Sequence, residues 1–117
     1  MLQQATERYP ADPSSFALYA LVAEQQRHYD AARASLIAYS ALAGEDAGFA
    51  ERAARIASLS MQLNDPQTAV VWYERAASAA PGSVPPLVGL AGAHLAAGDI
   101  ERAREVAGRA AAINPEI

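Results

Sequence analysis

Two histidines are the residues of this chain best suited to proton transfer or metal binding. His28 and His94 lie far apart in the sequence, and neither is accompanied by a Cys, Asp or Glu at a metal-ligand spacing. Catalysis and metal binding both need polar groups that converge on one point. Because His94 falls on an apolar helical stripe, we expect a packed, hydrogen-bonded core histidine, whereas His28 falls in a turn and the pair Glu45-Asp46 in a solvated loop.

The glycines and serines do not form a recognisable reaction centre either. Gly89, Gly92 and Gly98 are spaced by three and six residues, which differs from phosphate-binding loops. No nucleophile elbow or Ser/His/Asp set can be assembled. We expect Gly92 to let a neighbouring helix or a ligand come close, and Gly98 to form a turn. The sequence therefore predicts that the protein is not an enzyme, and it predicts neither a cofactor nor a metal.

Composition restricts the partners. The chain has 117 residues, a net charge of −4, no Cys and no Lys, so that every basic residue is Arg. No cluster of Arg is uninterrupted, which disfavours nucleic acid, and no stretch approaches the roughly 18 apolar residues of a membrane span. The exclusive use of Arg indicates a bacterium of high GC content. A cysteine-free chain suits the cytoplasm and the periplasm equally, so the compartment stays open.

The elements that would position a binding site come from an internal repeat. Residues 50–83 and 84–117 follow the same pattern at an offset of 34 residues. The matches combine small residues, a turn aspartate and a closing proline. They are Ile56 with Leu90, Ala57 with Ala91, Asp65 with Asp99, Ala69 with Ala103, Arg75-Ala76-Ala77 with Arg109-Ala110-Ala111, and Pro81 with Pro115.

Each repeat predicts a pair of helices. Apolar and small residues recur at helical spacing in both halves of residues 50–83, as at Ala53, Ile56 and Ala57 in the first half. Between the halves, Asn64 tolerates a left-handed turn and Asp65 can cap the next helix. One such hairpin cannot bury both of its faces, so we expect successive hairpins to stack.

This pattern resembles the tetratricopeptide repeat family. The resemblance implies an all-α solenoid of antiparallel helix hairpins with a right-handed superhelix, forming a single domain over residues 1–117. The expected units are 13–46, 50–83 and 84–117, preceded at 2–10 by a partial repeat or an N-terminal helix. The first unit departs from the family because Gly44 replaces the closing proline, and its offset of 37 places about three extra residues near 44–48. We interpret the chain as a fragment of a bacterial protein.

Three details of the helices can be predicted as well. The segment His28-Tyr29-Asp30 should form the first turn. Ser83 should cap the helix that accepts Pro85 and Pro86 in its first turn. The last helix should bury a stripe of four residues, namely Ala103, Val106, Ala107 and Ala110.

The resemblance also implies where a partner would bind. In this family the first helix of each repeat lines a concave groove, and the matching positions here are Ala17, Leu21, Glu24, Glu51, Ala54, Ser58, Met61, Val88, Gly92 and Leu95. One branch of the family captures a carboxylate with Lys and Asn, which are missing from these positions. An extended peptide or an amphipathic helix with apolar anchors fits this small, apolar groove better.

Two functions remain open. The first is an adaptor or scaffold that binds a protein or peptide in the groove during a bacterial assembly or envelope process. The alternative is a structural domain that self-associates through its terminal helices, by way of Val106, Ala110 and Ile113 at one end or Leu2 and Ala5 at the other. The groove can also be read as the plain inner face of a superhelix, with the true contact elsewhere.

Overall fold

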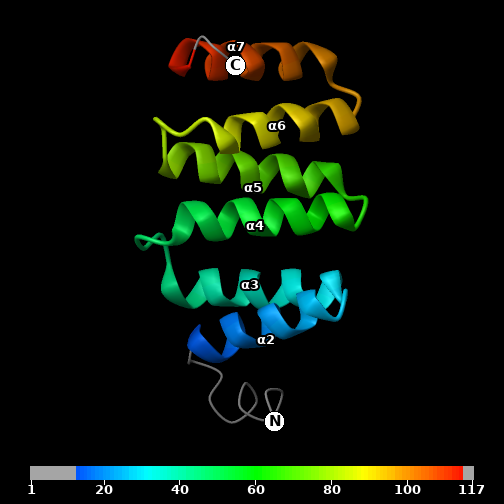
Figure 1. The fold of residues 1–117 in the computed structure, drawn as a ribbon, viewed down its shortest axis with the longest axis vertical. Coiled ribbons are helices and arrows are strands. Elements are labelled where there is room, and N and C mark those ends of the chain that lie inside the picture. The colour runs from blue at the N-terminus through cyan, green and yellow to red at the C-terminus, as the bar shows by residue number, and fades with distance from the viewer. Residues whose placement is uncertain (1–12, 115–117) are drawn as a thin grey trace.

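The computed structural model describes residues 13–114, and their side chains from residue 18 onward. This part of the chain consists of six helices that stack in chain order, each running back alongside the one before it (Figure 1). They form three hairpins. The helices are α2 (Pro13–Gln25) with α3 (Tyr29–Ala43), α4 (Phe49–Gln62) with α5 (Pro66–Ala79), and α6 (Pro85–Ala96) with α7 (Ile100–Ile113). The predicted all-α solenoid of helix hairpins is confirmed; the segment 2–10 lies outside the described residues.

The three hairpin turns close with the same backbone hydrogen bond. An amide donates to the carbonyl five residues earlier, from His28 to Ala23 at 2.7 Å, from Asp65 to Ser60 at 2.9 Å and from Asp99 to His94 at 2.8 Å. The residue before each amide is left-handed, as expected for this type of helix end.

The left-handed residues are Asn64 with φ 58°, Gly98 with φ 87° and, in the first hairpin, Arg27 with φ 61°. Asn64 and Gly98 confirm the predicted turns. The first turn was placed slightly too late, because Tyr29 already begins α3.

Two aspartates begin the second helices of their hairpins. Asp65 accepts a hydrogen bond from the Thr68 amide, and Asp99 accepts one of 3.1 Å from the Arg102 amide. These caps confirm the sequence prediction. The predicted Ser83 cap is wrong, since α6 begins after Val84 and has no side-chain cap.

The core is built from small residues on facing helices. On α4 the predicted stripe of Ala53, Ile56, Ala57 and Ser60 is completely buried. A cluster of apolar residues joins the first hairpin to the second; its members are Ala20 and Ala23 of α2, Ala32 and Leu36 of α3, and Ile56 and Leu59 of α4. Alanines let the helix axes approach closely, and larger side chains fill the remaining space.

Two predictions about the last hairpin are wrong. Ala107 is exposed, whereas Ala103, Val106 and Ala110 of the same helix are buried as expected. For Gly92 the alternative of a close neighbouring helix is wrong, because Gly92 faces open space; the helix contact occurs at Gly89, where a Cβ atom would overlap the ring of Tyr73. A helix buries only one stripe, so the residue after Val106 turns away from the core.

The inserted residues between α3 and α4 are held by one arginine. The Arg52 side chain donates to Ser40 Oγ at 2.9 Å, to the Gly44 carbonyl at 3.0 Å and to Asp46 Oδ1 at 3.2 Å. Its guanidinium also lies 4.4 Å from the centre of the Tyr39 ring. These contacts tie the loop to both helices, so the extra residues leave the stack continuous.

Candidate functional site

The predicted groove residues lie on the first helices of the three hairpins. Glu51, Ala54, Ser58 and Met61 are on α4, while Val88, Gly92 and Leu95 are on α6. Leu21 and Glu24 are on α2; Ala17 belongs to the same helix, but its side chain lies outside the described residues. Equivalent positions of different hairpins therefore occur on α2, α4 and α6.

Three of these residues line a cavity of about 560 Å³ beside α4. It lies where the inserted loop separates the first and second hairpins. Its walls come from α3, the end of the loop and α4, and the lining residues are Leu36, Tyr39, Gly48, Glu51, Arg52, Ala54, Arg55 and Ser58. We call it the α3–α4 cavity. It brings the predicted Glu51, Ala54 and Ser58 together with two arginines and a tyrosine.

A second cavity, of about 450 Å³, borders the other side of the same residues. It is lined by Ala50, Glu51, Ala54, Tyr73, Ala80, Ser83, Pro85 and Pro86. We call it the α4–α6 cavity. Its walls are mostly apolar. Because Glu51 and Ala54 line both cavities, the start of α4 forms the partition between them.

The other predicted groove residues differ in how accessible they are. Leu21, Val88 and Leu95 have exposed fractions of 44%, 53% and 57%, which is high for large apolar side chains. Met61 is half-buried and packs against a core cluster that includes Ala57. The exposed leucines and valine are available to a partner, whereas Met61 is partly used by the core.

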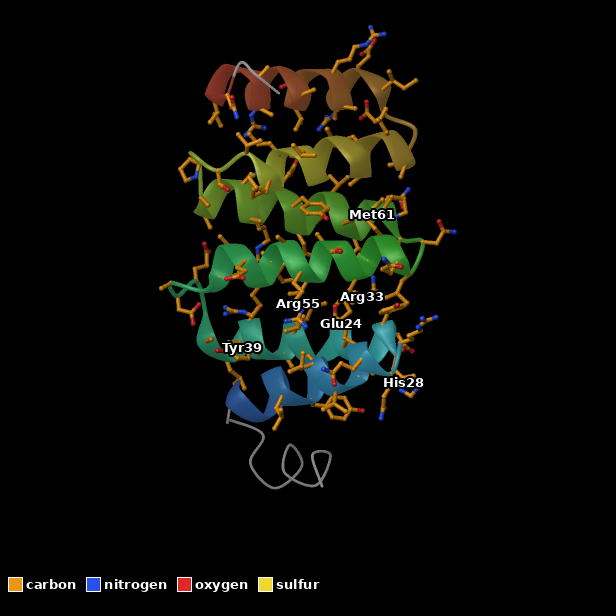
Figure 2. All side chains as sticks on the ribbon, in the orientation of Figure 1. Glu24, His28, Arg33, Tyr39, Arg55 and Met61 are labelled. Carbon is orange, nitrogen blue, oxygen red and sulfur yellow. The ribbon has the colours of Figure 1, made fainter. Side chains whose placement is uncertain are left out.

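The two arginines of the α3–α4 cavity are already paired. Arg52 binds Asp46 as described, and Arg55 forms an ion pair with Glu24 of α2. Figure 2 shows Glu24 and Arg55 pointing toward one another, with Arg33 nearby between α3 and α4. Glu24, predicted as a groove residue, is thus bound to another side chain of the domain.

Arg33 of α3 links the first hairpin to the second near the turn between α4 and α5. Its guanidinium donates to Ser60 Oγ at 3.2 Å and to Asp65 Oδ2 at 2.9 Å. The hydrogen bond from Thr68, together with that from Arg33, lowers the pKa of Asp65 below its ordinary value. The first two hairpins are therefore joined by charged contacts as well as by the apolar cluster.

Tyr73 connects the α4–α6 cavity with the core. Burial raises the pKa of its phenol, and a hydrogen bond with Ser58 opposes this rise. Its ring also packs against α6 at Gly89. The ring therefore packs against the core and also forms part of a cavity wall.

The histidines lie in different surroundings. His94 is buried at 5% exposure, which confirms its place in the core, while His28 is exposed at the hairpin turn. Within residues 13–114, no three His, Cys, Asp or Glu side chains are grouped so as to hold a metal ion. None of helices α2–α7 has the length and hydropathy that a membrane span requires.

Four of the residues that line the two cavities were not predicted from the sequence. No motif of the family marks these positions, which are Tyr39, Arg52, Arg55 and Pro86. The available signal was spacing: Arg52 and Arg55 are three residues apart on the helix that carries Glu51 and Ala54. Their neighbours on α2 and α3 depend on how the hairpins stack.

The residues expected to support end-to-end pairing are placed less favourably. Val106 and Ala110 are buried inside the domain, where they join a core cluster with Leu87 and Leu90. Ile113 has an exposed fraction of 41%. Leu2 and Ala5 lie outside the described residues. At the α7 end, only one of the three named side chains is therefore exposed.

Comparison with known proteins agrees with this architecture. Residues 60–116 match the family model described as tetratricopeptide repeat. A comparison with curated proteins gives no match.

Two solved structures have the same fold. The one described as "Crystal structure of MamA protein" matches with a TM-score of 0.82 and 15% sequence identity over 98% of this chain and 61% of its own. The one described as "MamA MSR-1 C2" matches with a TM-score of 0.82 and 16% identity over 98% of this chain and 64% of its own. This chain therefore spans a little over three fifths of the length of either. At such identity the likeness concerns the fold.

The family fold has a general role. Stacked helix hairpins of this kind expose an extended surface to other proteins, and they serve as protein-interaction modules that are generally non-catalytic. The 34-residue repeat and the match over residues 60–116 identify this part of the chain as tetratricopeptide repeats, and the described hairpin stack has the fold expected of that family.

Proposed function

We propose that this interaction module binds a segment of a partner protein along the face of α4 that carries Glu51, Ala54 and Ser58. The observation that supports the proposal is the arrangement of the two cavities, which meet at Glu51 and Ala54. A peptide that crosses this partition can place one side chain in each cavity. Concave sites with a few polar groups on a mostly apolar wall are typical of binding sites.

Exposed apolar residues on the neighbouring helices extend the site. Val88 of α6 follows Ala54 by one repeat, and Leu21 of α2 precedes Ser58 by the longer offset of the first repeat. Leu95 lies two helical turns after Val88 on α6. These side chains provide apolar contacts on either side of the cavities, as an extended peptide or an amphipathic helix requires.

The cellular role that we propose is an adaptor or scaffold in a bacterial assembly or envelope process. The exclusive use of Arg supports the bacterial source. Self-association through the terminal helices ranks below groove binding, because Val106 and Ala110 are already buried in the core.

Selection of peptides tests this function. A library of random peptides displayed on phage is selected on the protein, and the enriched peptide is synthesised with a fluorescent label. Its affinity is then measured for the protein, for Ala54→Arg and for the control Ala107→Arg. Ala54 lines both cavities, whereas Ala107 is exposed on α7, so the two variants add the same group at different places.

We expect Ala54→Arg to abolish binding and Ala107→Arg to leave it unchanged, with circular dichroism confirming that both variants stay helical. Ser58→Arg provides a second block from an exposed position of the α3–α4 cavity in case Ala54→Arg does not fold. Absence of any enriched peptide, or equal affinity for all folded variants, would overturn groove binding.

A further inference from the structure

One charged side chain at the two cavities has no partner in the part of the chain that the structure describes. Three charged residues line them: Glu51, Arg52 and Arg55. Arg52 is paired with Asp46, and Arg55 with Glu24. Glu51 is exposed and makes no hydrogen bond or ion pair with any residue in the described part of the chain. A free carboxylate therefore stands on the partition that both cavities share.

The α4–α6 cavity surrounds this carboxylate with apolar surface. Ala50, Ala54, Pro85 and Pro86 contribute carbon atoms to its walls, and Tyr73 contributes an aromatic ring. The side chains of Arg and Lys combine a long apolar stem with a charged end. An apolar wall accommodates the stem, a carboxylate pairs with the charge, and an aromatic ring attracts a nearby cation.

We propose that the partner segment carries an Arg or Lys side chain that enters the α4–α6 cavity and pairs with Glu51. The inference rests on the proposed function, because it names the chemistry of the partner that the groove binds. The basic group provides the positive charge that Glu51 lacks, since the two arginines of the cavities are already paired. The stem of the same side chain covers the alanine and proline surface of the cavity.

An acidic partner fits this site poorly. A carboxylate at the partition would be repelled by Glu51, and it would have to share Arg55 with Glu24 and Arg52 with Asp46. The net charge of −4 also favours the approach of a basic segment over that of an acidic one. The charge pattern therefore selects a basic peptide.

The selected peptide provides the test. Each Arg of the peptide is replaced in turn by citrulline, which keeps the shape of arginine but carries no charge, and each Lys by norleucine. Affinities are measured for the protein, for Glu51→Gln and for the control Glu105→Gln, which changes an exposed glutamate of α7. Because Glu51 is exposed, Glu51→Gln keeps the fold and the shape of the cavity.

We expect one basic position to be enriched in the library. Neutralising it should weaken binding to the protein by about tenfold or more, the effect of losing one charge-assisted hydrogen bond. Glu51→Gln should cause the same loss for the charged peptide and no further loss for the neutral one, and Glu105→Gln should change neither. Added salt should weaken binding to the protein more than binding to Glu51→Gln.

Contrary results distinguish this inference from the proposed function. A consensus without a basic residue, or unchanged affinity for Glu51→Gln, would overturn the basic partner, while a loss of binding in Ala54→Arg would still support the groove. No enriched peptide, or full binding to Ala54→Arg, would overturn both.

Discussion

The ring of Tyr73 on α5 packs against the backbone of α6 at Gly89. A Cβ atom at Gly89 would overlap three atoms of that ring, whereas a Cβ atom at Gly92, one turn later on the same helix, would meet nothing within 4 Å. Two glycines of one helix thus have opposite structural roles. The contact joins the second hairpin to the third, and it holds the ring that lines the α4–α6 cavity.

The two glycines predict opposite effects of the same substitution. Gly92→Ala should stabilise the domain by about 0.5–1 kcal/mol, because alanine restricts the unfolded chain and suits a helix interior. Gly89→Ala should lower stability, since overpacking costs about 1–3 kcal/mol and exceeds that gain. Urea unfolding followed by circular dichroism measures both variants. Equal stabilisation by the two substitutions would show that the Tyr73 ring moves freely away from α6.

The first hairpin turn predicts a stabilising substitution. Arg27 is exposed and adopts φ 61°, the conformation that Gly98 adopts in the third hairpin. A left-handed residue with a side chain costs about 1–2 kcal/mol. Arg27→Gly should therefore raise the free energy of unfolding by roughly 1 kcal/mol, and Gly98→Ala should lower it by a similar amount. A decrease in stability for Arg27→Gly would contradict the assigned turn.

Asp65 and Asp99 predict unequal losses on removal of a helix cap. Asp65→Ala and Asp99→Ala should each cost about 1 kcal/mol of capping energy. Asp65 also binds Arg33 of α3, and the loss of a partly exposed ion pair adds about 0.2–1 kcal/mol. Among residues 13–114, the Asp99 side chain pairs only with Arg102, in the first turn of the helix that Asp99 caps. A double-mutant cycle with Arg33→Ala isolates the link between hairpins, and zero coupling energy would rule it out.

The same carboxylate predicts a pH dependence. The hydrogen bonds from Thr68 and Arg33 hold the pKa of Asp65 below its ordinary 3.8. The stabilisation is therefore complete above the ordinary pKa and is lost as the pH falls through the lower pKa of the folded state. The stability difference between the protein and Asp65→Asn should shrink as the pH falls below about 4. Urea titrations between pH 3 and pH 6 test this, and a constant difference would contradict it.

From the contacts of Arg52 we expect that this one side chain fixes the inserted loop. Its side chain is 9% exposed and donates to three acceptors on α3 and the loop. Arg52→Leu should cost about 1.5–3 kcal/mol, the range for hydrogen bonds to charged groups. The Phe49 amide, which donates to the Asp46 carbonyl, should also exchange hydrogen faster. The exposed Arg104→Leu on α7 is the matched control, and an equal effect of both variants would contradict the role of Arg52.

Local features of this protein could be predicted from the sequence alone. The repeat offset is visible when the chain is compared with itself, and the turn residue Asn64 and the caps Asp65 and Asp99 depend on neighbours a few residues away, so these patterns can be read from the chain. The buried stripe of α4 follows from helical spacing. The assignment of Glu51 and Ala54 to the groove side of α4 came from the resemblance to the tetratricopeptide repeat family and remains part of the proposal.

The cavities and their charges were decided by the tertiary structure. Whether Glu24 reaches Arg55, and whether Gly89 or Gly92 meets Tyr73, depends on the rotation and spacing of hairpins that are distant in sequence. A shift of about one residue along a helix turns a side chain by roughly 100°, which is enough to exchange a buried position for an exposed one. The sequence alone therefore determined the helices and their turns, and only the packed stack determined that, of the two glutamates predicted for the groove, Glu24 is paired and Glu51 has no partner among the described residues.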